Sequence, residues 1–190
     1  MRRLWVGLVV GVVGVGLIGC ERGVTGSGQV GIAQGATAQS GAQAGGAQAD
    51  GMTEEERARM IAELRAAYAA FNRGDIAAAL EPMDERIEWS EPKEFPGGGV
   101  YHGREGARRY LTRSRAGLAD GTSEPEEFIP VGDKIVVLVH ARVRPKGSFA
   151  WQELRLADVY TIRDGKAVAM RAFADRGEAM AWARGQLGAR

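Results

Sequence analysis

The sequence contains only one cysteine, Cys20, and two histidines, and this scarcity excludes two ways of stabilising a small fold. A single cysteine cannot form a disulfide within the chain. Two histidines without a cysteine cluster do not supply the four ligands of a structural zinc site, so the sequence indicates neither a metal nor a cofactor. An excess of basic charge is also lacking, since the net charge is +1 and residues 52–190 carry equal numbers of acidic and basic side chains. Nucleic-acid phosphates require a basic surface, so we expect no nucleic-acid partner.

Large side chains are nearly absent from residues 21–51, which consist mostly of Gly, Ala, Gln, Ser and Thr. Such a segment buries too little apolar surface to offset the entropy lost on ordering. The sequence therefore predicts a disordered tether over residues 20–51, with ends about 30 Å apart on average. Only residues 52–190 have the mixture of apolar and charged side chains that builds a core, and their number is typical of one domain.

The N-terminus has the pattern of a secretory signal peptide over residues 1–19. Arg2 and Arg3 precede an uncharged run that extends to Gly19 and is shorter than the ~20 residues needed to span a bilayer. Leu17-Ile18-Gly19-Cys20 resembles the lipobox of bacterial lipoproteins. The resemblance implies cleavage before Cys20, lipidation of its thiol, and a domain held at a membrane of the cell envelope on the periplasmic or extracellular side. An uncleaved anchor, or an ordinary signal with a chance cysteine, are the alternatives.

Helices are expected first in the folded part. Thr53 and Glu56 form a capping box, so a helix should begin there and end at Gly74. Asp75 caps a short second helix, a third follows Gly103, and residues 176–187 form a closing helix. The inner faces of the first and third helices are predicted from helical spacing to comprise Met60, Ile61, Leu64, Tyr68 and Phe71, and Ala107, Tyr110, Leu111 and Leu118.

Strands are expected after the first helices, which indicates an α+β fold. Ile87 and Trp89 alternate with polar residues and predict a first strand, followed by an irregular loop through Gly97-Gly98-Gly99. Further strands are predicted over 128–131, 134–144 and 149–162, and a turn at Asp164-Gly165 leads to a last strand over 167–174.

The order of these elements resembles the nuclear transport factor 2-like superfamily, in particular its SnoaL-like and ketosteroid isomerase-like branches, over roughly residues 60–182. The resemblance rests on the order and spacing of short motifs: Phe71-Asn72-Arg73-Gly74-Asp75, Trp89 with Glu91-Pro92, Val100 to Glu105, Asp164-Gly165-Lys166 and Phe173-Ala174-Asp175. It implies that residues 52–190 are a SnoaL-like domain, a curved antiparallel β-sheet wrapped around a cone-shaped pocket closed by the N-terminal helices. Isomerases, polyketide cyclases, epoxide hydrolases and non-catalytic binders share this fold, so the fold alone does not give the function.

The resemblance implies two catalytic positions. Glu91 matches the general base of the ketosteroid isomerases, and Asp158 matches their second acid, which donates a hydrogen bond from an apolar site. The residues themselves support Asp158: if Lys146-Gly147 is a two-residue turn, Asp158 pairs with Ile135 on a largely apolar face, where burial raises its pKa. A structural acid with a hydrogen-bond partner, or a register slip that turns it to solvent, are the alternatives. Glu91 is alternatively a solvated loop residue.

The sequence departs from the ketosteroid isomerase pattern in two ways, and both argue against steroid isomerisation. The isomerase tyrosine on the first helix corresponds to Ala67, and the neighbouring Tyr68 is rotated by ~100°. Glu91 is also one methylene longer than the aspartate of that family. Other residues are expected as pocket walls, or as plain core: Trp89, Tyr68, Tyr160, Val137, Val139 and Leu156.

Arg171 has two alternative orientations. With a two-residue turn at Asp164-Gly165 it lies opposite Asp158, keeps that carboxyl ionised, and with Glu91 resembles the carboxylate–arginine set of limonene epoxide hydrolases. With a three-residue loop that includes Arg163 it faces outward, and the apolar pattern favours this arrangement.

Two functions remain open from the sequence. The first is a tethered module that binds a small apolar molecule, and the incomplete catalytic set favours it. The alternative is an enzyme that uses Asp158 and Glu91 for proton transfer. Both carboxyls directed at one point favour the enzyme, and a solvent-directed Glu91 favours the binder. The opposite sheet face is either an exposed charged surface or, as in many relatives, a homodimer interface; it holds His140, Arg142, Trp151, Glu153 and Arg155.

Overall fold

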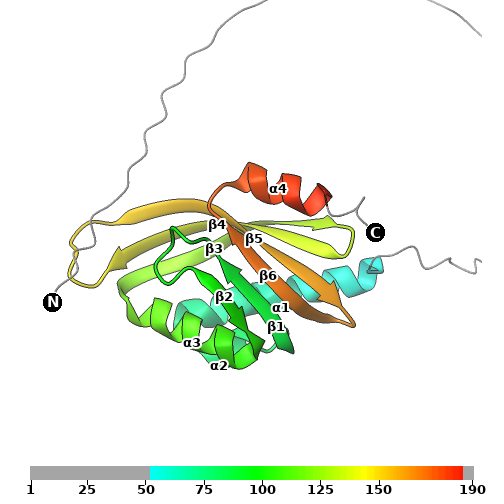
Figure 1. Ribbon diagram of the computed structural model, residues 1–190, viewed down its shortest axis with the longest axis horizontal. Coiled ribbons are helices and arrows are strands. Elements are labelled where there is room, and N and C mark those ends of the chain that lie inside the picture. The colour runs from blue at the N-terminus through cyan, green and yellow to red at the C-terminus, as the bar shows by residue number, and fades with distance from the viewer. Residues whose placement is uncertain (1–51, 186–190) are drawn as a thin grey trace, which may run out of the picture. The chain divides into compact units, whose positions relative to one another are not determined.

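The computed structural model describes residues 52–185 and shows a curved sheet with helices on both faces (Figure 1). The predicted signal peptide, Cys20 and tether lie outside the described residues. The elements follow in the order α1 (Glu54–Arg73), α2 (Ile76–Ala79), β1 (Met83–Glu91), β2 (Gly99–His102), α3 (Gly103–Ala116), β3 (Leu118–Val131), β4 (Lys134–Pro145), β5 (Gln152–Arg163), β6 (Lys166–Phe173) and α4 (Arg176–Gly185). None of the helices in this range is long and apolar enough to cross a membrane.

Helix α1 begins and ends where its capping residues predict. The Thr53 hydroxyl accepts a hydrogen bond from the Glu56 amide at 3.2 Å, and the Glu56 carboxylate accepts one from the Thr53 amide at 2.9 Å. Gly74 ends the helix at φ 81°, a left-handed conformation that glycine adopts at little cost. Asn72 then exchanges two hydrogen bonds with the backbone of Ser123, which fixes the end of α1 against β3.

The sheet is mixed rather than fully antiparallel, which corrects the expectation from the sequence. Its strand order is β2-β1-β6-β5-β4-β3, and all neighbours are antiparallel except β1 and β6. These two strands are separated by most of the domain along the chain, so the order of strands in the sequence does not reveal that they pair. The edge strands β2 and β3 do not meet, and the curved sheet therefore stays open (Figure 1).

Two further differences concern the region around α3. Strand β2, which pairs with β1, was not predicted, because its four residues lie between a glycine-rich loop and a helix. Helix α3 ends at Ala116, so Leu118 begins β3 instead of completing the helix. Strand β3 is consequently much longer than expected, and its two prolines fit its position at the sheet edge.

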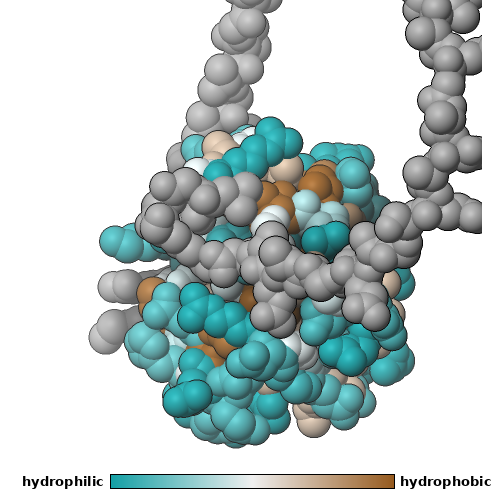
Figure 2. Space-filling model, turned by 90° about the vertical axis from the view of Figure 1, so that its right-hand side faces the viewer, coloured by the Kyte–Doolittle hydropathy of each residue, from teal (hydrophilic) through white to brown (hydrophobic). Residues whose placement is uncertain are grey.

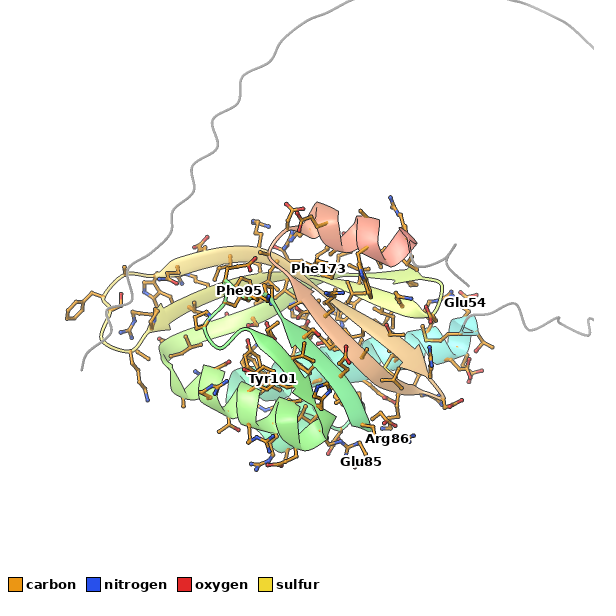
Figure 3. The ribbon with its side chains drawn as sticks, in the orientation of Figure 1. Glu54, Glu85, Arg86, Phe95, Tyr101 and Phe173 are labelled. Atoms are coloured by element: carbon orange, nitrogen blue, oxygen red, sulfur yellow. The ribbon has the colours of Figure 1, made fainter. Side chains whose placement is uncertain are left out.

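Each face of the sheet has its own core. Helices α1, α2 and α3 cover the concave face, where the larger cluster includes Leu64, Ile87 and Met170, all at most 1% exposed. Helix α4 covers part of the convex face and packs on Val136, Val159 and the ring of Phe173 (Figures 1 and 3). The sheet thus separates two apolar environments.

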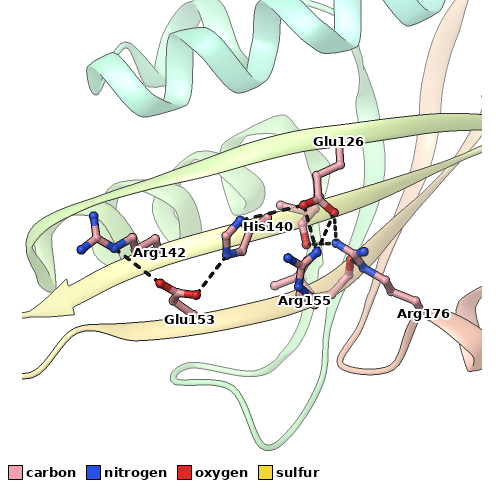
Figure 4. A network of polar contacts seen from close by, with 8 residues as sticks. Glu126, His140, Arg142, Glu153, Arg155 and Arg176 are labelled. Carbon is pink, nitrogen blue, oxygen red and sulfur yellow. Dashed lines mark hydrogen bonds and ion pairs between the residues drawn. The ribbon is translucent and has the colours of Figure 1, made fainter.

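The remainder of the convex face carries a network of charges (Figure 4). Glu126 accepts hydrogen bonds from Arg155 at 3.0 Å and Arg176 at 2.7 Å, and Glu153 lies 3.6 Å from Arg142. His140 lies between the two carboxylates. Both carboxylates therefore have cationic partners within one chain, and the homodimer through this face stays a prediction.

Candidate functional site

Asp158 lies on the concave face of β5, as the sequence predicts, although its partner differs. It pairs with Val137 instead of Ile135, because residues 146–151 connect β4 and β5 where a two-residue turn was expected. The shift is two residues, and side chains alternate with a period of two, so Asp158 keeps its face. Strands β4 and β6 pair with its backbone on both sides, and the residue is partly exposed.

Tyr68 is the direct partner of Asp158. Its hydroxyl donates a hydrogen bond of 2.5 Å to Asp158 Oδ2, and the Tyr160 hydroxyl lies 3.4 Å from the Tyr68 hydroxyl. The sequence predicted Tyr68 as a pocket wall, but not as the tyrosine that contacts the second acid. An ungapped count placed the tyrosine of the isomerases at Ala67, but Tyr68 of α1 is the residue that reaches the acid.

Glu91 ends β1 on the same face of the sheet, not in a solvated loop. Ser90 pairs with Arg171, which places Glu91 beside Ala172, and Ala172 also pairs with Asp158. The two acids thus flank one small residue, with Cα atoms about 10 Å apart at the usual strand spacing. Trp89 donates a hydrogen bond of 2.8 Å from its indole to Glu91 Oε1.

Burial raises the pKa of both acids. The pKa of Asp158 rises to about 6 through loss of hydration, against the opposing effect of the Tyr68 hydrogen bond. The pKa of Glu91 rises to about 8 through loss of hydration and repulsion from Asp158, and the hydrogen bonds from Trp89 and Tyr110 offset this in part. Both carboxyls lie on the concave face, on either side of Ala172, so their titrations influence each other.

Tyr110 and Ser114 of α3 complete the polar cluster, and neither was predicted as a site residue. Burial, followed by the nearby Glu91 charge, raises the pKa of Tyr110, which hydrogen-bonds both Glu91 and Ser114. The signal was present in the sequence, because Tyr110 belongs to the predicted inner face of α3 and Ser114 lies one turn later on that face.

Arg171 does not pair with Asp158. The turn at Asp164-Gly165 has two residues, since Arg163 pairs with Lys166, but a bulge between Ala167 and Ala169 shifts the register by one. Arg171 consequently pairs with Val159 and faces the convex side. Its guanidinium lies 5.5 Å from the Trp182 ring and 5.8 Å from the Phe173 ring. The favoured orientation is thus correct, but a bulge produces it instead of a three-residue loop.

The expected pocket walls lie on this face, and their burial decreases along β5. Val137, Val139 and Tyr160 are at most 4% exposed. Along β5 toward the β4–β5 connection, Leu156 and Leu154 become half-buried. The accessible part of the site therefore extends from Asp158 toward that connection. Within residues 52–185, no group of three or more His, Cys, Asp or Glu side chains is placed to hold a metal ion.

The chain belongs to the SnoaL-like domain family, whose model matches residues 64–170. A comparison with curated proteins gives no match.

Solved structures support the nuclear transport factor 2-like fold. TerC, crystallised with polyporic acid, is 27% identical, with a TM-score of 0.55 over 67% of this chain and 98% of TerC. A nuclear transport factor 2-like protein of Burkholderia xenovorans is 27% identical, with a TM-score of 0.54 over 70% of this chain and 99% of its own. SalBIII, an epoxide hydrolase/cyclase-like enzyme of pyran ring formation in salinomycin, is 24% identical, with a TM-score of 0.52 over 63% of this chain and 91% of its own. The similarity to SalBIII supports the fold alone.

Proposed function

We propose that this domain catalyses proton transfer on a small, largely apolar molecule bound between the concave face and α1 and α3. The observation that carries the proposal is the pair of carboxyls beside Ala172, whose pKa values lie on either side of neutral pH. At pH 7 Asp158 is mostly ionised and can accept a proton, and Glu91 is mostly protonated and can donate one. This reverses the roles that the resemblance to ketosteroid isomerases implied.

The surroundings favour an apolar substrate with a single polar end. Val137, Val139, Leu156 and the rings of Trp89 and Tyr160 provide the apolar contacts. No cation contributes to the pKa shift of Asp158, and an ionised Asp158 repels an anionic group, so a neutral polar end is favoured. An enolisable ketone or a polyketide-like ring fits: the base takes the proton next to the carbonyl, and the acid protonates the oxygen.

The test is base-promoted ring opening of 5-nitrobenzisoxazole, a small apolar probe. The base removes the C3 proton, the N–O bond breaks, and the acid protonates the resulting phenolate oxygen. Asp158→Asn should lower kcat/KM about 100-fold or more, and Glu91→Gln less, because the phenolate is a good leaving group. The matched control is Glu126→Gln on the convex face, which should leave the rate unchanged. A wild-type rate no greater than that of acetate would overturn catalysis.

A non-catalytic binder is the second candidate, and the Tyr68 contact favours it. Tyr68 already occupies one oxygen of Asp158, which is the ionised member of the two site acids at pH 7. In that case the neutral fluorescent probe N-phenyl-1-naphthylamine should bind wild type and Asp158→Asn alike, and Val139→Trp, which fills the concave face, should abolish binding. Binding without ring opening of the benzisoxazole would identify the binder.

We further propose that lipidated Cys20 tethers the domain to a membrane of the cell envelope. The support is the lipobox-like sequence around the single cysteine. Cys20→Ala should release the protein from membrane fractions or leave it as an uncleaved precursor, both visible on immunoblots of fractionated cells. Wild-type processing and fractionation in the variant would contradict the lipid anchor.

A further inference from the structure

The connection between β4 and β5 presents aromatic side chains to solvent. Phe149 is 99% exposed and Trp151 is 41% exposed, whereas the only other large hydrophobic side chain in residues 52–185 that is similarly exposed is Val100 of β2. Figure 1 shows this hairpin projecting at the left, away from the helices that cover the sheet. Exposed aromatic rings at a hairpin tip lack the partner that a folded domain usually gives them.

Three cations lie near these rings, and one of them, Arg142, is paired with Glu153. Residues 142–152 contain Arg142, Arg144 and Lys146 and no acidic residue. The guanidinium groups of Arg142 and Arg144 lie 4.4 and 5.5 Å from the centre of the Trp151 ring, so cations and aromatic surface are presented together. The opposite end of the molecule differs, since its visible described surface is mainly hydrophilic with small hydrophobic patches (Figure 2).

We propose that this tip, residues 142–152, docks on an anionic lipid surface. Phe149 enters the acyl boundary, and Trp151 lies at headgroup level, where amphipathic aromatic rings are favoured. Arg144 and Lys146 contact the anionic headgroups. This contact is independent of Cys20 and of the proposed activity.

Docking would orient the candidate site. The half-buried Leu154 and Leu156 mark the accessible part of the concave face, which extends from Asp158 toward this tip. A tip held in the lipid surface would direct that opening at the membrane. The ligand class that follows is a membrane-soluble molecule that reaches Asp158 without crossing open water.

The experiment places an environment-sensitive fluorophore, NBD, on one engineered cysteine of the full-length chain with Cys20→Ser. Ala150→Cys labels the tip, and Arg163→Cys labels the far end of β5, about 36 Å from the start of that strand at the usual strand rise. Mixing with vesicles of about 30% phosphatidylglycerol in phosphatidylcholine should raise the emission at position 150 about twofold or more and leave position 163 unchanged. Vesicles of phosphatidylcholine alone, or high salt, should reduce the gain.

Matched variants separate the tip from general adhesion. Phe149→Ser should abolish the gain at position 150, whereas Val100→Ser, which removes a similarly exposed apolar side chain elsewhere, should preserve it. Equal gains at positions 150 and 163, or no gain at either, would overturn the proposal. A gain that appears without vesicles and grows with protein concentration would overturn it too, by identifying a second copy of the chain as the occupant.

Discussion

The two faces of the sheet shift the pKa of a glutamate carboxyl in opposite directions. On the convex face, the hydrogen bond from Arg176, with further help from Arg155 and His140, lowers the pKa of Glu126. On the concave face, burial and the Asp158 charge raise the pKa of Glu91 to about 8. A carboxyl beside cations and water stays ionised, and one beside aromatic rings and a second carboxyl holds its proton near neutral pH. Reactivity therefore depends on which face a residue occupies.

Alternation along β5 produces this contrast within a few residues. Arg155 faces the charge network and Asp158 faces the aromatic cluster, although only two residues separate them. A slip of one residue in the pairing with β4 would exchange the two environments. The β4–β5 register is thus the structural basis of both surfaces.

The largest expected effect concerns the cores under the two faces. Leu64→Ala removes a fully buried side chain from the large concave cluster and should lower the free energy of unfolding by about 2–5 kcal/mol. Leu138→Ala on the convex side, where the side chain is only partly buried, should cost less than half as much. Urea denaturation of both variants measures the difference. Equal losses would contradict the view that the concave cluster is the main core.

Asp158→Asn tests the raised pKa through stability. The folded pKa of about 6 lies above the ordinary value, so the protonated form is favoured by folding. Stability is then full below about pH 4 and is lost as the pH rises through 6, by about 2–3 kcal/mol for wild type. Asp158→Asn lacks this loss, so it should match wild type below about pH 4 and exceed it at pH 8 in denaturant titrations.

Glu126→Gln is the control, because the stability that Glu126 contributes should change with pH in the opposite direction to that of Asp158. Its pKa is lowered in the folded state, so the stability that Glu126 contributes is present at neutral pH and is lost as the pH falls through the folded pKa. The variant should therefore differ from wild type at pH 7 and converge with it in acid. Destabilisation of Asp158→Asn at pH 8 would show instead that a buried cation depends on the Asp158 charge.

Replacing Arg176 and Arg155 in turn compares a partly buried member of the convex network with an exposed one. Arg176 donates to the backbone carbonyls of Val139 at 2.7 Å and Leu156 at 3.2 Å as well as to Glu126. Arg176→Met leaves both carbonyls without this donor and should cost about 1–3 kcal/mol. Arg155→Met loses a contact to Glu126 alone and should cost about 0.5 kcal/mol or less. Thermal and urea unfolding of the pair measure this ranking, and equal costs would contradict it.

The smallest effect is expected for Glu153. Its contacts with His140 at 3.5 Å and Arg142 at 3.6 Å are long, and its side chain is 63% exposed. Glu153→Gln should change the free energy of unfolding by no more than about 0.5 kcal/mol, and less at high salt. A loss above 1 kcal/mol, measured in low salt, would mean that the network acts as one cooperative unit rather than as separate pairs.

The helices and the faces of the central strands were predictable because their determinants are local. The Thr53–Glu56 capping box and Gly74 set the limits of α1 within a few bonds of the residues concerned. Alternation placed Asp158 on the concave face even though its assumed partner was wrong by two positions. In contrast, the parallel pairing of β1 with β6 joins segments far apart in the chain, and the bulge beside Val168 leaves no pattern in hydrophobicity.

The features of the candidate site also differ in whether the sequence alone could predict them. The sequence by itself placed Asp158 on an apolar face, because the alternation of a strand is visible in consecutive residues. It identified Glu91 only through the resemblance to the ketosteroid isomerases. Only the tertiary structure decided that they flank Ala172 and that Tyr68, rather than Ala67, reaches Asp158. It also decided that Arg171 faces away from both acids. Strand order, bulges and the rotation of a helix over a sheet depend on packing between distant segments, and that packing sets the hydration and charge that fix each pKa.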